Sequence, residues 1–265
     1  MLRGASAEAE AQLTSELEGS KGEAGKLGEE LFGVARVLRS EAALRRIFTD
    51  ASIEASAKAD LAGNVFGNAL GETALGLVKS AVQLRWTSPR DLADVVEELG
   101  VQAAVRSAGS DGSRISDELF EVRRVVDQTP GLRTALSDPA RSATDKNGLL
   151  QSLFGERLLP ASMLLLEQAA AGAHGAIDGA LEGYQHTAAH ANGEKIATVR
   201  TARELSDADR TRLAEALGSQ YDSAIHLQVV VDPELVGGLR VEIGDDVIDG
   251  TVSSRLDDAR RRLVG

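Results

Sequence analysis

The segment at residues 19–26 (GSKGEAGK) has a composition like that of a phosphate-binding loop. Such a loop needs a glycine five residues before its last glycine, and a serine or threonine after its lysine to bind magnesium. Here Ser20 occupies the glycine position, Leu27 occupies the hydroxyl position, and no strand pattern precedes the segment. We therefore interpret it as a flexible connector and not as a nucleotide site.

His186 and His190 lie four residues apart in the sequence HTAAH, which is the spacing of a zinc protease motif. Thr187 replaces the glutamate that would activate water, and no third ligand is apparent. The favoured interpretation is a solvated or partner-facing helix. A metal-dependent hydrolase stays open as an alternative, which zinc analysis of the purified chain would test.

Two charged clusters lie near the C-terminus. Asp245, Asp246 and Asp249 lack the alternating acids and the late glutamate of a calcium loop, so we expect Asp249 to make local turn hydrogen bonds. The arginines at 260–262 could bind phosphate, but three cations in a last helical turn are also what the helix dipole attracts, and we favour that interpretation.

The composition gives no positive sign of catalysis. The chain of 265 residues has no cysteine and 3% aromatic residues, and no serine, threonine or lysine stands beside a base in a known motif. Its net charge of −12 is spread without a basic arm, which argues against nucleic acid and anionic lipid as partners. The sequence predicts no catalytic residue, cofactor, metal site or membrane insertion, and it favours a protein partner.

The helical part of the sequence repeats itself. Residues 30–78 align without gaps on residues 118–166, and 16 of these 49 positions are identical. Within each copy, apolar residues recur at three and four residues, as at Leu31, Val34 and Leu38, which is the spacing of a helical stripe. Each copy is therefore expected to form a small helical bundle.

Helix signals divide the chain into three predicted domains, residues 1–105, 106–191 and 192–265. Ser88 and Pro89 start a helix expected at 91–105, and Pro160 starts another that runs to about residue 171. Since the repeat is only 88 residues long, the helix at 91–105 can close the first bundle and open the second. GSDGS at 109–113 separates the copies.

The last part of the chain has a different pattern. Strands are expected at 195–202, 225–232 and 239–243, with a capped helix at 207–221 and a final amphipathic helix at about 252–264. A hairpin is expected at residues 244–246. The predicted fold class is mainly α, with a duplicated N-terminal helical bundle followed by a small α+β C-terminal domain.

The tail at 229–263 resembles the C-terminal signature of the delta subunit of F-type ATP synthases, the family that includes the oligomycin-sensitivity-conferring protein. Residues 195–213 resemble a strand, turn and helix of that family, and 132–155 resemble its N-terminal bundle, with Lys146 at the family's lysine. The signature falls on Asp232, Pro233, Gly237, Gly238, Gly244, Asp249, Gly250, Arg255 and Leu256.

The duplication makes the chain similar to the lengthened delta chains of actinobacteria. The absence of a transmembrane helix ahead of the repeat resembles the form that is not fused to a b segment. Family members usually carry Gly-Arg after the fifth helix of the bundle. The first copy has Arg85 and Trp86 there, whereas the second has AGAHGA around His174. The role of that arginine therefore does not carry over to the second copy.

The resemblance implies a non-catalytic stator subunit that joins the catalytic head to the peripheral stalk, so that rotation of the central stalk is coupled to ATP synthesis. The implied partners are an amphipathic helix from the alpha subunit N-termini and the end of the b subunit, and the implied location is the cytoplasmic face of the plasma membrane, as a peripheral component. A second bundle raises the hypothesis of a second alpha tail. A helical adaptor unrelated to ATP synthase is the remaining alternative, although it would have no reason to carry the tail signature.

Candidate contact residues follow from apolar spacing within this resemblance, with simple core packing as the competing interpretation. For the alpha helix they are Leu13, Leu17, Leu75, Leu77, Val78 and Val82 in the first copy, and Val95, Val96, Leu99, Met163, Leu165 and Leu166 in the second. For the b subunit they are Leu256, Ala259, Leu263 and Val264.

Overall fold

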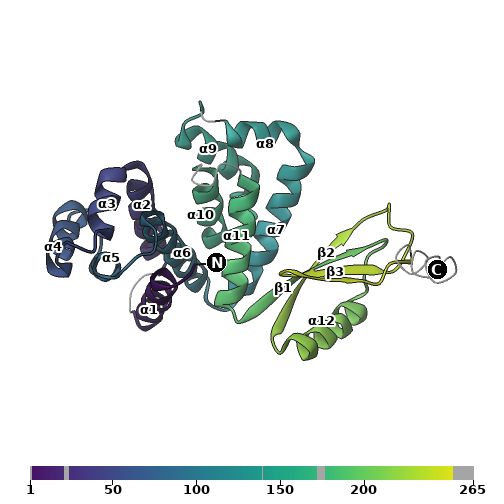
Figure 1. Ribbon diagram of the computed structural model, residues 1–265. Coiled ribbons are helices and arrows are strands. Elements are labelled where there is room, and N and C mark those ends of the chain that lie inside the picture. The colour runs from purple at the N-terminus through teal and green to yellow at the C-terminus, as the bar shows by residue number, and fades with distance from the viewer. Residues whose placement is uncertain (1, 21–23, 139, 172–176, 253–265) are drawn as a thin grey trace, which may run out of the picture. The chain divides into compact units, whose positions relative to one another are not determined.

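The computed structural model describes residues 2–20, 24–138, 140–171 and 177–252. The chain forms two compact units, residues 1–188 and residues 189–265. The first unit is entirely helical in its described part, and the second combines a sheet with a helix (Figure 1). This arrangement confirms the predicted fold class, mainly α with a small α+β region at the C-terminal end.

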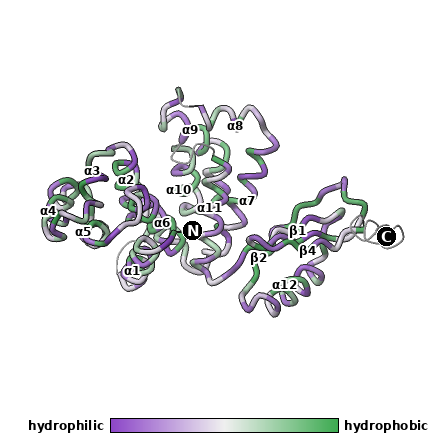
Figure 2. The backbone as a smooth tube through the Cα atoms, in the orientation of Figure 1, coloured by the Kyte–Doolittle hydropathy of each residue, from purple (hydrophilic) through white to green (hydrophobic). Residues whose placement is uncertain are grey.

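The helical unit contains two series of helices. The first series is α1 (Ala5–Gly19), α2 (Ala24–Ser40), α3 (Ala42–Thr49), α4 (Ala55–Phe66), α5 (Glu72–Gln83) and α6 (Pro89–Ser107). After the short 3-10 turn η1 (Gly109–Asp111) come α7 (Gly112–Gln128), α8 (Pro130–Ser137), α9 (Ala143–Phe154), α10 (Pro160–Ala170) and α11 (Ile177–Ala191). Figure 2 shows hydrophobic and hydrophilic residues interleaved along these helices, as amphipathic helices around a core require.

The sequence repeat is visible in the positions of the helices. Each of α7 to α11 begins 88 residues after its counterpart among α2 to α6. The counterpart of α1 would cover residues 93–107, and this stretch lies inside α6. Helix α6 is therefore the last helix of one six-helix bundle and the first helix of the next. We call α1 to α6 the first bundle and α6 to α11 the second bundle.

Helix α6 supplies both cores because it is apolar around much of its circumference. Leu92 and Leu99 belong to the core of the first bundle, whereas Val101 and Val105 belong to the core of the second. The helix starts two residues earlier than the sequence analysis expected, because Pro89 fits the first turn and Ser88 and its partner Asp91 form a capping box.

Helices α2 and α6 cross closely at two glycines. A Cβ atom built on Gly100 would lie 2.7 Å from two ring carbons of Phe32, and one built on Gly28 would lie 3.1 Å from the carbonyl oxygen of Gly100. The ring of Phe32 thereby reaches from α2 into the core of the second bundle. The two small residues set the short distance between these helices.

The C-terminal unit is built from β1 (Glu194–Thr201), α12 (Asp207–Tyr221), β2 (Ala224–Val231), β3 (Leu239–Ile243) and β4 (Asp246–Asp249). The order in the sheet is β2-β1-β3-β4. Strands β1 and β2 are parallel and α12 connects them, while β3 pairs antiparallel with both β1 and β4. The core of this unit includes Val199, Val241 and Leu217. The final helix expected at 252–264 lies outside the described residues, except for Val252.

Candidate functional site

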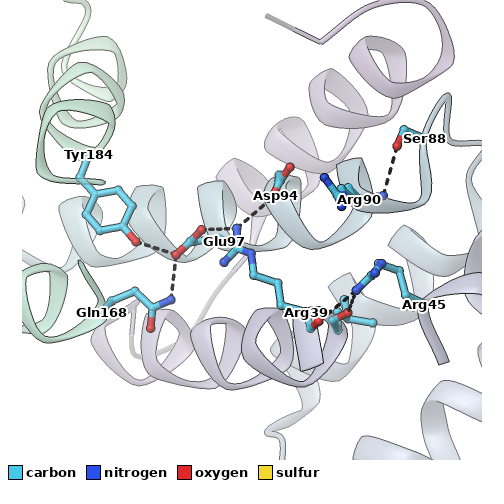
Figure 3. A network of polar contacts seen from close by, with 9 residues as sticks. Arg39, Arg45, Ser88, Arg90, Asp94, Glu97, Gln168 and Tyr184 are labelled. Carbon is cyan, nitrogen blue, oxygen red and sulfur yellow. Dashed lines mark hydrogen bonds and ion pairs between the residues drawn. The ribbon is translucent and has the colours of Figure 1, made fainter. Parts of the chain in front are cut away.

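A buried charge network of the helical unit centres on Glu97 of α6 (Figure 3). The side chain of Glu97 is 3% exposed. Its Oε2 accepts a hydrogen bond from Nη2 of Arg39 at 2.5 Å. Its Oε1 accepts one from Nε2 of Gln168 at 2.8 Å and another from the hydroxyl of Tyr184 at 2.6 Å. Both carboxylate oxygens therefore have donors, as a buried charge requires.

The network joins helices from both bundles. Arg39 lies on α2 of the first bundle, whereas Gln168 lies on α10 and Tyr184 on α11 of the second. A further link runs from Nη1 of Arg36 on α2 to Oε1 of Gln168, at 2.7 Å. These polar contacts fix the second bundle against the first in addition to the continuous backbone of α6.

Electrostatics inside the network favour one set of protonation states. Burial raises the pKa of Tyr184 far above its ordinary value, and the negative charge of Glu97 adds to this effect. Burial works against the guanidinium charge of Arg39, but hydrogen bonds and attraction from Glu97 and Asp94 outweigh it, so the pKa of Arg39 is raised. The phenol thus stays a donor and the guanidinium stays charged. This arrangement can hold two bundles together, but it offers no reactive group.

This network was not predicted from the sequence, although the sequence carries one signal of it. Glu97 falls on the same helical stripe as Ala93, Gly100 and Ala104, all of which are buried. A charged residue within an apolar stripe is rarely buried without a partner, so this position predicts a paired carboxylate. The identity of the partners could not be read from the sequence, because they lie 58 to 87 residues away along the chain.

The residues predicted to bind the alpha helix in the first bundle lie together on α1 and α5, but they belong to the core. Leu13 and Leu17 on α1 are at most 1% exposed. On α5, Leu77, Val78 and Val82 are at most 5% exposed, and Leu75 is half-buried against the same core. These side chains therefore pack in or against the core of the first bundle, and their contact with the alpha helix stays a prediction.

The six residues predicted in the second copy are not brought together. Val95, Val96 and Leu99 pack in the core of the first bundle. Met163, Leu165 and Leu166 pack in the core of the second. The counterparts of Leu13 and Leu17 on α6 are Val101 and Val105, which do lie in the core of the second bundle. All six predicted side chains are at most 6% exposed.

The family signature residues that the structure describes have turn and strand-end roles. Gly238 has a φ of +82°, and a Cβ there would lie 2.4 Å from the carbonyl oxygen of Gly250. Oδ1 of Asp249 accepts hydrogen bonds from the hydroxyl of Thr251 at 2.7 Å and from its backbone N–H at 2.9 Å, which lowers the pKa of Asp249. The local turn bonding expected of Asp249 is confirmed.

The remaining signature residues lie at the ends of strands or outside the described part. The carboxylate of Asp232 accepts from the backbone N–H of Glu234 at 3.0 Å, just before the turn that contains Pro233. Gly237 and Gly244 have positive φ angles. Arg255 and Leu256 of the signature, and the predicted b-subunit contacts Leu256, Ala259, Leu263 and Val264, lie outside the described residues, as do the arginines at 260–262.

The other chemical motifs can be located as far as the structure describes them. His186 and His190 are both exposed on α11, and no group of three or more His, Cys, Asp or Glu that could hold a metal occurs among the described residues. Lys146 is buried, and its Nζ donates to the carbonyl oxygen of Ala170 at 3.4 Å, at the C-terminal end of α10. Residues 21–23 of the phosphate-loop candidate and His174 lie outside the described part. In the described ranges, no helix combines the length and hydrophobicity needed to cross a membrane.

Comparison with known proteins identifies relatives over the whole chain. Residues 101–263 match the family model of the ATP synthase delta (OSCP) subunit. ATP synthase subunit delta of a Nocardioides species is 54% identical over 268 residues, which cover 100% of this chain and 98% of the relative. The subunits delta of Streptomyces avermitilis and Kineococcus radiotolerans are each 39% identical. The alignments cover 90% and 98% of this chain, and 89% and 95% of those relatives.

Proposed function

The chain belongs to the ATP synthase delta (OSCP) subunit family, and from this we propose that it is the stator subunit that joins the catalytic head to the peripheral stalk. The observation that carries the proposal is the 54% identity with an actinobacterial subunit delta across the full length of both chains. In this role the chain prevents the head from turning with the central stalk, which couples rotation to ATP synthesis. It acts as a peripheral component on the cytoplasmic face of the plasma membrane.

A stator needs mechanical stiffness and binding surfaces, and it needs no reactive side chain. Stiffness is supported by two features of the helical unit: the bundles share α6, and Glu97 links Arg39 of one bundle to Gln168 and Tyr184 of the other. If one bundle moved against the other, these buried polar groups would lose their partners. Breaking a buried ion pair costs roughly 3–5 kcal/mol.

The division into two units suits two attachments. We assign the alpha subunit N-terminal helices to the helical unit and the b subunit to the C-terminal unit. Binding of an amphipathic helix by a helical surface depends on apolar anchors at three- and four-residue spacing, with polar residues at the rim. Because the twelve residues first considered for alpha lie mostly in the core, the alpha helix must contact exposed side chains beside them.

Two experiments test the proposal on the full chain. In the first, a synthetic peptide of the alpha N-terminus from the same organism is titrated into the chain in a calorimeter. One or two peptides per chain support the clamp, with two peptides indicating that each bundle holds an alpha tail. The absence of heat at micromolar concentrations contradicts the alpha assignment.

The second experiment measures coupling. ATP synthase in membrane vesicles is stripped of this subunit and then reconstituted with the purified chain, and ATP hydrolysis and proton pumping are recorded on the same sample. We expect hydrolysis to persist without the chain and pumping to return only with it. Equal pumping with and without the chain overturns the proposed function.

A further inference from the structure

The second bundle carries an apolar groove on its surface. The groove has a volume of about 540 Å³ and lies between α8 with the end of α7 on one side and α9 on the other. Leu132 and Phe154 are 9% and 8% exposed and line it from the core side, while Val125 and Leu153 are 40% and 43% exposed. A volume in this range is typical of binding pockets. Large apolar side chains left open beside such a groove mark an interaction surface.

The charge of the groove is positive. Among the described residues that line it, the charged ones are Arg141 and Arg157. Nε of Arg141 lies 4.0 Å from a carboxylate oxygen of Asp138, a long contact between two half-exposed side chains. The guanidinium of Arg157 makes no ion pair within the described part of the chain. Two cations beside an apolar groove, in a chain with a net charge of −12, complement an acidic partner.

The first bundle provides an internal comparison, because each lining residue has a counterpart 88 residues earlier. The apolar residues Leu132, Leu149, Leu153 and Phe154 correspond to Leu44, Leu61, Val65 and Phe66. The residues that differ in size or charge are Thr129, Gly131, Ala135, Arg141 and Arg157, which correspond to Glu41, Ala43, Ile47, Ile53 and Ala69.

These differences change the size and the charge of the side chains at the groove. The side chain of Ile47 is 41% exposed, whereas its counterpart Ala135, which lines the groove, carries a smaller side chain. At the compared positions the first bundle carries one acid, Glu41, and no arginine, whereas the second carries two arginines and no acid. The duplicated scaffold has therefore acquired two surfaces of different charge at equivalent places.

We propose that the α7–α8–α9 groove binds a single amphipathic helix of a protein partner, with an apolar stripe in the groove and aspartate or glutamate residues along its flanks. A helix is the occupant that fits, because its side chains at three- and four-residue spacing enter a groove between helices. The acidic flanks contact Arg141 and Arg157. This inference does not rest on the stator function, since it concerns the surface alone.

The test uses two synthetic peptides of about 18 residues, or five helical turns. Both carry the same leucine stripe, and the flanks are glutamate in one and lysine in the other. Because the chain has no cysteine, a single fluorophore can be attached through Ser152→Cys on α9, next to the groove. The matched control is Asn64→Cys, the equivalent position on α4 of the first bundle.

We expect the glutamate peptide to change the fluorescence of the label at residue 152 and not at residue 64. It should bind about tenfold more tightly than the lysine peptide in dilute buffer, and the difference should shrink in about 0.5 M salt, which screens exposed charges. Equal affinity for the two peptides overturns the proposal, as does the absence of binding by the glutamate peptide.

Two substitutions of equally exposed residues locate the contact. Leu153→Asp places a charge on the groove, and Val65→Asp places the same charge at the equivalent point of the first bundle, where the exposed fraction is 44% compared with 43%. We expect Leu153→Asp to weaken binding of the glutamate peptide at least about tenfold, as loss of an interface anchor does, and Val65→Asp to leave it unchanged. Equal effects of the two substitutions overturn the assignment to the second bundle.

A charge reversal tests the electrostatic part separately. Arg157→Glu should favour the lysine peptide over the glutamate peptide, which reverses the order of affinities in the wild type. If the order stays the same, the arginines do not select the partner. Circular dichroism of each variant confirms that the helices are retained. Because the synthetic peptides need no other subunit, failure here leaves the stator proposal standing, and failure of the coupling assay leaves the groove standing.

Discussion

Tyr184→Phe is the substitution that tests whether the two bundles unfold as one. It removes the hydroxyl that donates to Oε1 of Glu97 at 2.6 Å and leaves the aromatic ring in the core. A hydrogen bond to a charged group contributes about 1.5–3 kcal/mol. Since Oε1 keeps the donor from Gln168 at 2.8 Å, we expect the lower part of this range. The free energy of unfolding should therefore fall by about 1.5–2 kcal/mol.

The two bundles can be observed separately in one experiment. Trp86 is the only tryptophan of the chain. It lies in the connection between α5 and α6, where its Nε1 donates to the carbonyl oxygen of Ala81 on α5 at 2.9 Å. Tryptophan fluorescence therefore reports the first bundle, whereas far-ultraviolet circular dichroism reports all helices. For a unit of this size, a loss of 1.5–2 kcal/mol corresponds to a decrease in melting temperature of about 3–8 °C.

If α6 and the Glu97 network make the bundles cooperative, both signals should shift by the same amount, although Tyr184 lies on α11 of the second bundle. A shift in circular dichroism with an unchanged Trp86 transition would refute the coupling, because it would show that the first bundle unfolds independently. Wild-type chain melted in the same buffer is the reference for both signals.

The pH dependence gives a second check on the same variant. The folded pKa of Tyr184 is raised by burial and by Glu97, so the stability from its hydroxyl is fully present below the unfolded tyrosine value of about 10. That stability is lost as the pH rises through this value toward the folded pKa. The difference in unfolding free energy between wild type and Tyr184→Phe should therefore be constant from pH 7 to 9 and decrease above pH 10. A constant difference up to pH 11.5 would contradict the assignment.

Four further substitutions have defined outcomes in thermal or urea unfolding. Gly100→Ala should destabilise the helical unit by about 1–3 kcal/mol through overpacking against α2. Gly76→Ala, where the added Cβ would have no atom within 4 Å, should stabilise it by about 0.5–1 kcal/mol. Changes in unfolding free energy of the same sign would refute the crossing geometry. Asp249→Ala should destabilise the C-terminal unit at pH 7, and the effect should vanish as the pH falls through the lowered pKa of Asp249, because the bonds to Thr251 need the ionised form. Ser88→Ala should cost about 1 kcal/mol as a lost N-cap, and an unchanged melting temperature would show that Pro89 suffices to start α6.

The sequence was most informative where local patterns determine structure. The 88-residue repeat, the start signals at Ser88 and Pro160, and the alternation in β3 each depend on neighbouring residues, and the helices and strands occur where these patterns predict them. The turn bonds of Asp249 were predictable for the same reason, since their donors lie two residues away.

Long-range packing was less predictable, and α6 shows why. Its apolar residues surround the helix, so periodicity could not tell which residues face which neighbour. Val95 and Val96 were therefore assigned to the second copy, although they pack in the first bundle. The groove beside Arg157 was missed for a related reason. A small residue, Ala135, lines it at a place where the other bundle has Ile47, and such a difference gains meaning only when the two bundles are compared in space.

The shared helix α6 also determines how the chain can change in length. A residue inserted in the middle of an α-helix moves everything after it forward by 1.5 Å and turns it by about 100°. An insertion within α6 would therefore change the direction of α7 to α11 relative to α1 to α5, whereas an insertion in the connection between α8 and α9 would alter one loop. Conversely, adding five helices and 88 residues at the end of α11 would append a whole further bundle, because the last helix of one repeat already serves as the first of the next. The repeat can therefore be extended one bundle at a time, and the length of each shared helix sets the orientation of the bundle that follows it.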